Sequence, residues 1–279
     1  MHGSPHALAG DLPAVAADVF ARLRERAPRI HCITNSVAQA FTANILLAVG
    51  AIPSMTIAPQ EVADFAARAD ALLVNLGTFD AERRAAIEIA LEKISEGKRP
   101  WILDPVLIDV SQPRAAYARV LAGRKPAAIR LNAAEFLALS GAGAGLEHFQ
   151  AKREPVRRPE TRHAKDALAR FAAETASVIG LTGATDIVGD GTRHIEIANG
   201  HPLMNAVTAM GCAASALVAA CLCVEKDAFA ATASALLAFS VAGEIAADMS
   251  KGPGSFAVVF IDALHNLDRT MFINRARVS

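Results

Sequence analysis

The chain has 279 residues, a length that suits one large α/β domain or two small domains. Hydrophobic residues make up 53% and charged residues 20%, which supplies a sizeable core and excludes a chain that is disordered throughout. Because 28 Lys and Arg are balanced by 28 Asp and Glu, the composition argues against a nucleic-acid binder or a membrane-surface binder.

The first half of the chain alternates between amphipathic helices and short apolar strands. Residues 1–12 lack the basic and apolar regions of a signal peptide, and we expect them to be flexible. The apolar spacing that follows predicts helices over 13–27, 41–50, 59–69 and 80–96, and strands over 30–33, 52–57, 71–77 and 100–106.

The second half continues this alternation and is interrupted by a basic connection. The pattern predicts a strand running into a helix over 127–139, a helix over 164–176, a strand over 177–183, a hairpin over 185–197 and a helical block from 211 to about 250. Residues 141–166, which are glycine-rich and then basic, are expected to be mobile. They read either as a solvated loop or as a lid whose cations screen a polyphosphate.

Two very apolar stretches, 209–224 and 228–243, fall within the helical block. Each is shorter than the roughly 20 residues that a bilayer span needs, so we predict buried helices and no membrane segment. The four cysteines form no CxxC pair, and a core of this size needs no disulfides. These features predict a cytoplasmic protein.

Alternating strands and helices predict a single α/β domain over residues 1–279, with a mostly parallel central sheet covered by helices on both faces. In such sheets, ligands bind at the carboxyl ends of the strands. The predicted strands end in small or polar residues, namely Asn75-Leu76-Gly77-Thr78, Asp104-Pro105, Arg130-Leu131-Asn132 and Thr182-Gly183.

Familiar cofactor motifs are absent from the sequence. The segment GAGAG (141–145) has the wrong glycine spacing for a dinucleotide fingerprint and follows a helix rather than a strand. The sequence contains no GxxxxGK[ST] motif and no HExxH or paired-cysteine metal motif.

The most informative stretch is VTAMGCAASALVAA (207–220), in which a glycine turn leads into a helix of small residues. The amides of a helix N-terminus bind anions, so a phosphate is expected near Gly211. Cys212 falls in the first turn, where its thiol pKa should be lowered. The alternative is that Cys212 is an ordinary buried cysteine in an alanine-rich helix.

Two carboxylates accompany this turn, Asp104 at a strand end and Glu135 at a helix start. Taken singly, each is typical of a helix cap or a surface charge. Carboxylates at such places also bind hard cations such as Mg²⁺, usually through water. Together with an anion-binding turn and the Thr182-Gly183 strand end, they point to phosphoryl transfer.

Several motifs in order resemble those of the hydroxyethylthiazole kinase family, which has the ribokinase-like fold. They extend over nearly the whole chain and comprise HCITN (31–35), FTANILLAVGAIPSM (41–55), ALLVNLGT (71–78), LDPV (103–106), AAIRLNAAE (127–135), LTGATD (181–186), NGHPLM (199–204), GC with its small-residue helix (211–220) and GPGSF (252–256). The resemblance implies Mg²⁺- and ATP-dependent phosphorylation of 4-methyl-5-(2-hydroxyethyl)thiazole in thiamine salvage. It also implies a homotrimer with active sites between subunits.

The resemblance also implies roles for particular residues. Cys212 stands where most ribokinase-like enzymes have an aspartate base and is the expected catalytic residue. The other expected roles are ATP binding by Arg130, Thr182, Asn132 and Gly211, substrate binding by Met55, Ala209, Asn35 and Val37, and Mg²⁺ binding by Asp104 and Glu135.

The chain departs from the family at positions that surround the expected ligands. The family reads VGTGC at the anion turn, where this chain has Ala209 for a glycine and Met210 for a threonine. Leu131 replaces a glycine, and Leu107 begins a stretch that is Gly-Val-Gly in the family. Two alternatives therefore stay open, a kinase for another small alcohol or vitamin precursor and a weakly active relative that binds ligand.

Overall fold

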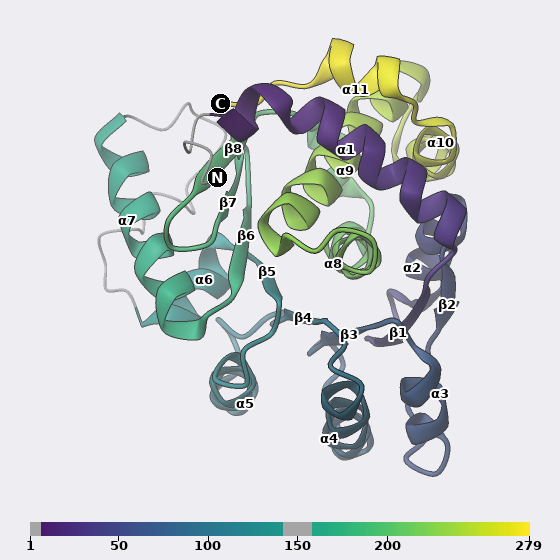
Figure 1. Cartoon of the computed structure of the whole chain (residues 1–279), viewed down its shortest axis with the longest axis vertical. Helices are drawn as coiled ribbons and strands as arrows, with labels where there is room; N and C mark the ends of the chain where they lie inside the picture. Colours follow the sequence, from purple (N-terminus) through teal and green to yellow (C-terminus); the bar gives the residue numbers. More distant parts are fainter. Residues whose placement is uncertain (1–6, 142–157) are drawn as a thin grey trace.

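The computed structural model describes residues 7–141 and 158–279, which form one eight-stranded sheet with helices on both faces (Figure 1). The strands are β1 (Arg29–Ile33), β2 (Ile52–Ser54), β3 (Ala71–Asn75), β4 (Trp101–Asp104), β5 (Ala128–Asn132), β6 (Val178–Thr182), β7 (Asp186–Gly189) and β8 (His194–Ile197). Their order across the sheet is β2-β1-β3-β4-β5-β6-β7-β8. The first six run parallel, whereas β7 and β8 pair antiparallel, which confirms the mostly parallel α/β fold.

Helices separate the strands and cover the two faces of the sheet. They are α1 (Ala7–Arg26), α2 (Gln39–Ala48), α3 (Val62–Arg68), α4 (Ala81–Glu96), α5 (Gln112–Ala122), α6 (Ala133–Ser140), α7 (Arg158–Thr175), α8 (Met210–Leu222), α9 (Ala228–Met249), α10 (Pro253–Asn266) and α11 (Arg269–Arg275), with a 3-10 turn at Pro202–Ala206. In Figure 1, α8 lies on one side of the central strands, whereas α3, α4 and α5 lie on the other.

Strand alternation divides the apolar side chains between these two faces. Ile30 and Cys32 of β1 join the core formed with α1, α8 and α9, while Ile33 joins the opposite core beneath α3 and α4. Each face of the sheet therefore has its own buried core, and the sheet is covered on both sides.

Two predicted boundaries differ from those of helices α1 and α7. Helix α1 begins at Ala7 and Leu12 is fully buried in the core, so the prediction of a flexible segment is wrong for residues 7–12. Residues 1–6 and 142–157 lie outside the described part. The prediction of a mobile loop over 141–166 is wrong for residues 158–166, which form the first turns of α7. This part of α7 is rich in residues that favour a helix.

One helix of the described part, α9, is long and apolar enough by length and composition to cross a membrane. Its 22 residues extend beyond the predicted end at 243, so the argument from short length is wrong for this helix. However, 83% of its most apolar window is buried within the fold. This burial is what the core helix of a globular domain shows.

Candidate active site

Four polar side chains lie on one face of the sheet, at or near the carboxyl ends of four adjacent strands. Asn75 pairs in register with Asp104, and the pairing of Leu103 with Ile129 places Arg130 beside Asp104. Thr182 ends the next strand, β6. The residues two positions before these four (Leu73, Ile102, Ala128 and Gly180) face the α8 and α9 side. Alternation therefore turns all four polar side chains toward the same side.

Helix α8 meets these strand ends with its N-terminus. Ala209 caps the helix in the left-handed conformation at φ 70°, and the helix runs from Met210. A Cβ added at Gly211 would lie 2.5 Å from Nη1 of Arg130, so any larger residue would push the guanidinium away from the start of the helix. The first turn of α8 and the Arg130 guanidinium are thus in contact, as an anion site requires.

A hydrogen-bonded network joins the thiol of Cys212 to the carboxylate of Asp104. The Asn35 amide donates to the sulfur of Cys212 at 3.3 Å and to Oδ1 of Asn75 at 3.0 Å. The Asn75 amide in turn donates to Oδ2 of Asp104 at 2.7 Å. Asn35 is held by its own contact with the amide of Ala38 at 2.9 Å. Two of the predicted residues, Cys212 and Asp104, are therefore brought together by a third, Asn35, and by Asn75.

Asp104 is completely buried, and burial raises its carboxyl pKa to about 6. The guanidinium of Arg130 opposes this rise, and the negative charge of Glu135 adds to it. The influence of Glu135 places the two predicted metal ligands within electrostatic reach of each other. Oδ1 of Asp104 is buried and has no hydrogen-bond partner, which fits a carboxylate that accepts a cation or its water.

Glu135 closes a capping box at the start of α6. Its Oε2 accepts from the backbone amide of Asn132 at 2.9 Å, while the Asn132 side chain accepts from the amide of Glu135 at 2.9 Å. Oε1 accepts from the amide of Leu107 at 3.0 Å. Leu107 adopts φ 57°, a conformation that suits glycine. Each carboxylate oxygen still has one free lone pair, so Glu135 fits a water-mediated contact with Mg²⁺.

No group of three His, Cys, Asp or Glu side chains within 7–141 and 158–279 has the arrangement of a metal centre. A cation between Asp104 and Glu135 would therefore complete its shell with water and substrate phosphates. This is the usual arrangement for Mg²⁺ in kinases.

Arg130 and Thr182 lie next to each other at the neighbouring strand ends. The guanidinium of Arg130 donates to the Thr182 hydroxyl at 2.5 Å. The Thr182 hydroxyl in turn donates to the carbonyl of Leu131 at 3.3 Å. Below them, Asp186 accepts from the amide of Gly183 at 3.0 Å and from the hydroxyl of Ser240 at 3.2 Å. Burial raises the pKa of Asp186 to about 6.

The predicted low pKa of Cys212 is wrong. Burial, and the nearby charge of Asp104, raise the pKa of the thiol to about 11, although the amides of Asn35 and Asn75 and the charge of Arg130 act in the opposite direction. The sulfur at this helix start is therefore a neutral thiol at physiological pH.

The remaining predicted residues line neighbouring segments. Val37 is 66% exposed and lies two residues beyond Asn35. Met55 follows β2, the strand that pairs with β1, and it packs partly buried against the core around α8. Sequence reasoning missed the linking roles of Asn75 and Ser215. The signal for Asn75 was its position at a strand end, and the signal for Ser215 was a lone hydroxyl in a helix of alanines.

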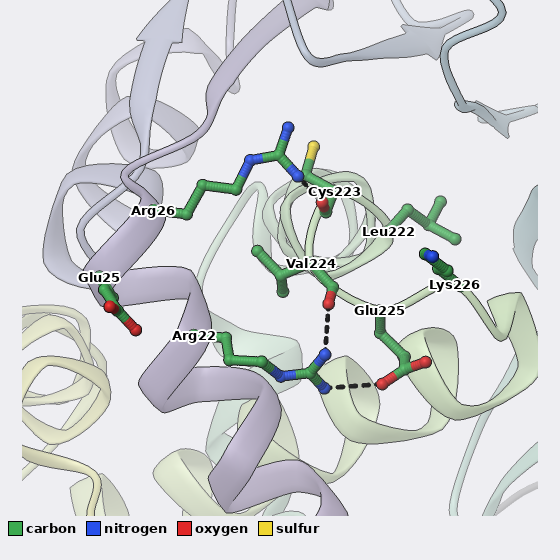
Figure 2. Close-up of a pocket in the computed structure, with 8 residues that line it drawn as sticks. All are labelled: Arg22, Glu25, Arg26, Leu222, Cys223, Val224, Glu225 and Lys226. Carbon is green, nitrogen blue, oxygen red and sulfur yellow. Dashed lines mark hydrogen bonds and ion pairs between the residues drawn. The ribbon is translucent and has the colours of Figure 1, made fainter.

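A separate cavity of about 440 Å³ lies where the C-terminal part of α1 meets the C-terminal end of α8 (Figure 2). Arg22 donates to the carbonyl of Val224 at 2.5 Å and to the carboxylate of Glu225 at 2.6 Å. Arg26 donates to the carbonyl of Cys223. These guanidiniums cap the C-terminal end of α8, so their hydrogen-bonding capacity is largely used within the protein.

Comparisons with known proteins point to a single family. The profile of the hydroxyethylthiazole kinase family matches residues 20–270. A probable hydroxyethylthiazole kinase of Agrobacterium fabrum is 39% identical, covering 97% of this chain and 98% of the relative. A hydroxyethylthiazole kinase of Klebsiella pneumoniae is 44% identical, covering 91% of this chain and 96% of the relative.

Solved structures give the same result at the level of the fold. The hydroxyethylthiazole kinase protein of Pyrococcus horikoshii superposes with a TM-score of 0.86 at 33% identity, covering 95% of this chain and 98% of that chain. A ribokinase-like superfamily protein of Enterococcus faecalis superposes with a TM-score of 0.63 at 13% identity, covering 92% of this chain and 95% of that chain, which confirms the ribokinase-like fold. The chain therefore belongs to the hydroxyethylthiazole kinase family.

Proposed function

We propose that this protein transfers the terminal phosphoryl group of ATP to the hydroxyl of 4-methyl-5-(2-hydroxyethyl)thiazole, as a step of thiamine salvage. Its relatives in Agrobacterium fabrum and Klebsiella pneumoniae, named as a probable hydroxyethylthiazole kinase and as a hydroxyethylthiazole kinase, support this activity. The structural observation that carries the proposal is the network from Cys212 through Asn35 and Asn75 to Asp104, which lies beside the contact between Arg130 and Gly211. In this arrangement, the attacking hydroxyl would lie beside Cys212, and the phosphates would lie beside Arg130 and Gly211.

In this proposal the nucleotide lies over the carboxyl ends of β5 and β6. Arg130, Thr182 and Asn132 contact ATP, and the amides that begin α8 at Gly211 face its terminal phosphate. Phosphoryl transfer has a loose transition state, so charge stabilisation and positioning supply most of the rate. Arg130 fits this task because its hydrogen bond to the Thr182 hydroxyl holds the guanidinium beside the helix amides at Gly211.

Mg²⁺, when bound, would neutralise charge on the phosphates, with Asp104 and Glu135 holding it and its waters. The unpartnered Oδ1 of Asp104 supports this assignment. Asp104→Asn is expected to reduce the affinity for Mg²⁺ and the rate. The Mg²⁺ concentration that gives half-maximal rate is the measurement.

Cys212 is the proposed catalytic residue, and its neutral thiol orients the acceptor hydroxyl. A thiol with a pKa of about 11 is a poor general base at neutral pH. A loose transition state needs little proton removal before bond formation, so orientation suffices. Met55, the backbone of Ala209, Asn35 and Val37 are the proposed contacts of the thiazole.

The proposed assembly is a homotrimer in the cytoplasm. Large exposed apolar side chains on neighbouring elements support an interface, among them Val37 before α2, Leu47 on α2, Ile52 on β2 and Phe65 on α3. In Figure 1 these elements lie together at one edge of the molecule. All four cysteines are free, which agrees with a reducing compartment.

An assay of ADP formation with Mg-ATP, with and without the thiazole alcohol, tests the proposed activity. We expect saturable, thiazole-dependent ADP formation. Turnover with a different small alcohol alone would instead support a kinase of altered specificity. Ligand-dependent thermal stabilisation without any turnover would support a binding protein, since a bound ligand stabilises the fold by mass action.

A further inference from the structure

The two oxygens of the Asp104 carboxylate have very different surroundings. Oδ2 accepts two hydrogen bonds, from the Asn75 amide at 2.7 Å and from the Ser215 hydroxyl at 2.9 Å. Oδ1 accepts none, although it is equally buried. A carboxylate in this setting is turned so that a single oxygen remains available to a ligand.

The Ser215 hydroxyl is placed to donate to the Asp104 carboxylate. Ser215 is fully buried in α8 between Ala214 and Ala216. Its single proton has two acceptors in reach, Oδ2 of Asp104 at 2.9 Å and the carbonyl of Gly211 at 3.3 Å. The bond to a carboxylate is the shorter and the stronger, so the proton goes to Asp104.

Ser215 and Asn75 approach Asp104 from different layers of the fold. Asn75 lies beside it in the sheet, whereas Ser215 comes from the helix above the sheet. Two donors from separate elements restrain rotation of the carboxylate more than one would. Donors that hold a metal-binding carboxylate from behind are known to determine its orientation and its affinity for the metal.

We propose that Ser215, together with Asn75, is a positioning residue that determines which oxygen of Asp104 faces the metal. This inference rests on the proposed function, because it takes the metal role of Asp104 as given. Ser215 acts only through Asp104 and touches neither nucleotide nor acceptor. Removal of its hydroxyl frees Oδ2 and lets the carboxylate turn.

The test uses Ser215→Ala, a change that α8 accommodates because alanine already surrounds the position and favours the helix. The matched control is Ser234→Ala, which removes a buried hydroxyl of α9 that has no hydrogen-bond partner. Binding of Mn²⁺ in the presence of a non-hydrolysable ATP analogue is measured by calorimetry or electron paramagnetic resonance. This readout does not depend on turnover.

We expect Ser215→Ala to weaken Mn²⁺ binding about 10-fold, as removal of such a supporting donor typically does. Ser234→Ala should bind Mn²⁺ as the unmodified protein does, and the KM for the thiazole alcohol should be unchanged in both variants. A Ser215→Ala protein with unchanged Mn²⁺ affinity, alongside an Asp104→Asn protein that loses it, would overturn the inference and leave the proposed function intact. Unchanged affinity in Asp104→Asn would overturn the metal assignment itself.

Discussion

Ala209 shows how a single methyl group alters the anion turn. Its φ of 70° is the left-handed conformation, in which a side chain costs about 1–2 kcal/mol. The corresponding glycine of the family carries no such cost. Leu107 repeats the pattern at φ 57°, so two of the residues that replace family glycines lie in strained conformations beside the proposed site.

Ala209→Gly is therefore expected to raise the free energy of unfolding by about 0.5–1 kcal/mol, the strain relieved minus the extra freedom of glycine in the unfolded chain. Denaturant unfolding provides the measurement. The matched control is Ala85→Gly on the exposed side of α4. This change should instead lower the free energy of unfolding by about 1 kcal/mol, because glycine disfavours a helix interior. Destabilisation by both changes would show that the turn carries no strain.

Cys212 offers a direct test of how much base catalysis the site needs. Cys212→Asp is expected to retain or raise kcat, because a carboxylate is the better base at neutral pH and the amide of Asn35 can donate to it. Cys212→Ser provides the comparison, and steady-state kinetics provide the measurement. A dead aspartate variant beside an active serine variant would exclude a base at this position.

The buried carboxyl of Asp186 makes the free energy of unfolding of the protein depend on pH. Its folded pKa of about 6 lies above the ordinary 3.8, so the neutral carboxyl stabilises the fold at low pH, and this contribution is lost as pH rises through 6. Asp186→Asn keeps a carbonyl acceptor but does not titrate. The difference in the free energy of unfolding between Asp186→Asn and the unmodified protein should therefore shift in favour of the variant, by up to about 3 kcal/mol, as pH rises from 4 to 7.5. Denaturant unfolding at both pH values is the measurement, and a constant difference would contradict the shift.

At the scale of elements, α8 connects the two ends of the sheet. Its N-terminus contacts Arg130, and its C-terminal end is capped by Arg22 and Arg26 (Figure 2). Helical spacing and strand alternation predicted most elements, including the hairpin of β7 and β8 that turns at Asp190-Gly191. Helices α5, α10 and α11 were not predicted from the sequence. For the seven-residue α11, tertiary packing rather than local sequence supplies most of the stability.

Arg22→Ala is expected to destabilise the protein by about 1 kcal/mol, because the carbonyl of Val224 and the carboxylate of Glu225 each lose a donor. The KM values should not change, since this cap lies at the end of α8 away from Cys212. Glu25→Ala is the control, because Figure 2 shows this side chain pointing away from the Val224 carbonyl. Thermal unfolding and kinetics of both variants check this expectation, and a large rise in the KM for ATP in Arg22→Ala would refute it.

At the scale of the whole molecule, strand order explains why distant segments meet. The sequence predicted the parallel sheet and placed Asp104, Arg130 and Thr182 at strand ends, and the register brings these ends together. It did not predict the partners of the carboxylate. Ser215 lies 111 residues from Asp104 along the chain, and no local pattern encodes a contact across the sheet and helix layers.

The proposed trimer predicts a solution mass of three chains, each of 29.2 kDa. Light scattering after size-exclusion chromatography measures it. Leu47→Glu places a charge among the exposed apolar side chains and should shift the mass toward one chain. A single-chain mass for the unmodified protein would contradict the assembly.

The most direct test of the account is a crystal structure with Mg²⁺, a non-hydrolysable ATP analogue and the thiazole alcohol. The account predicts the terminal phosphate at the amides that begin α8, Mg²⁺ between the phosphates and Asp104, and the alcohol oxygen beside the sulfur of Cys212. A nucleotide bound away from Arg130 and Gly211, for example in the cavity beside Arg22, would contradict it.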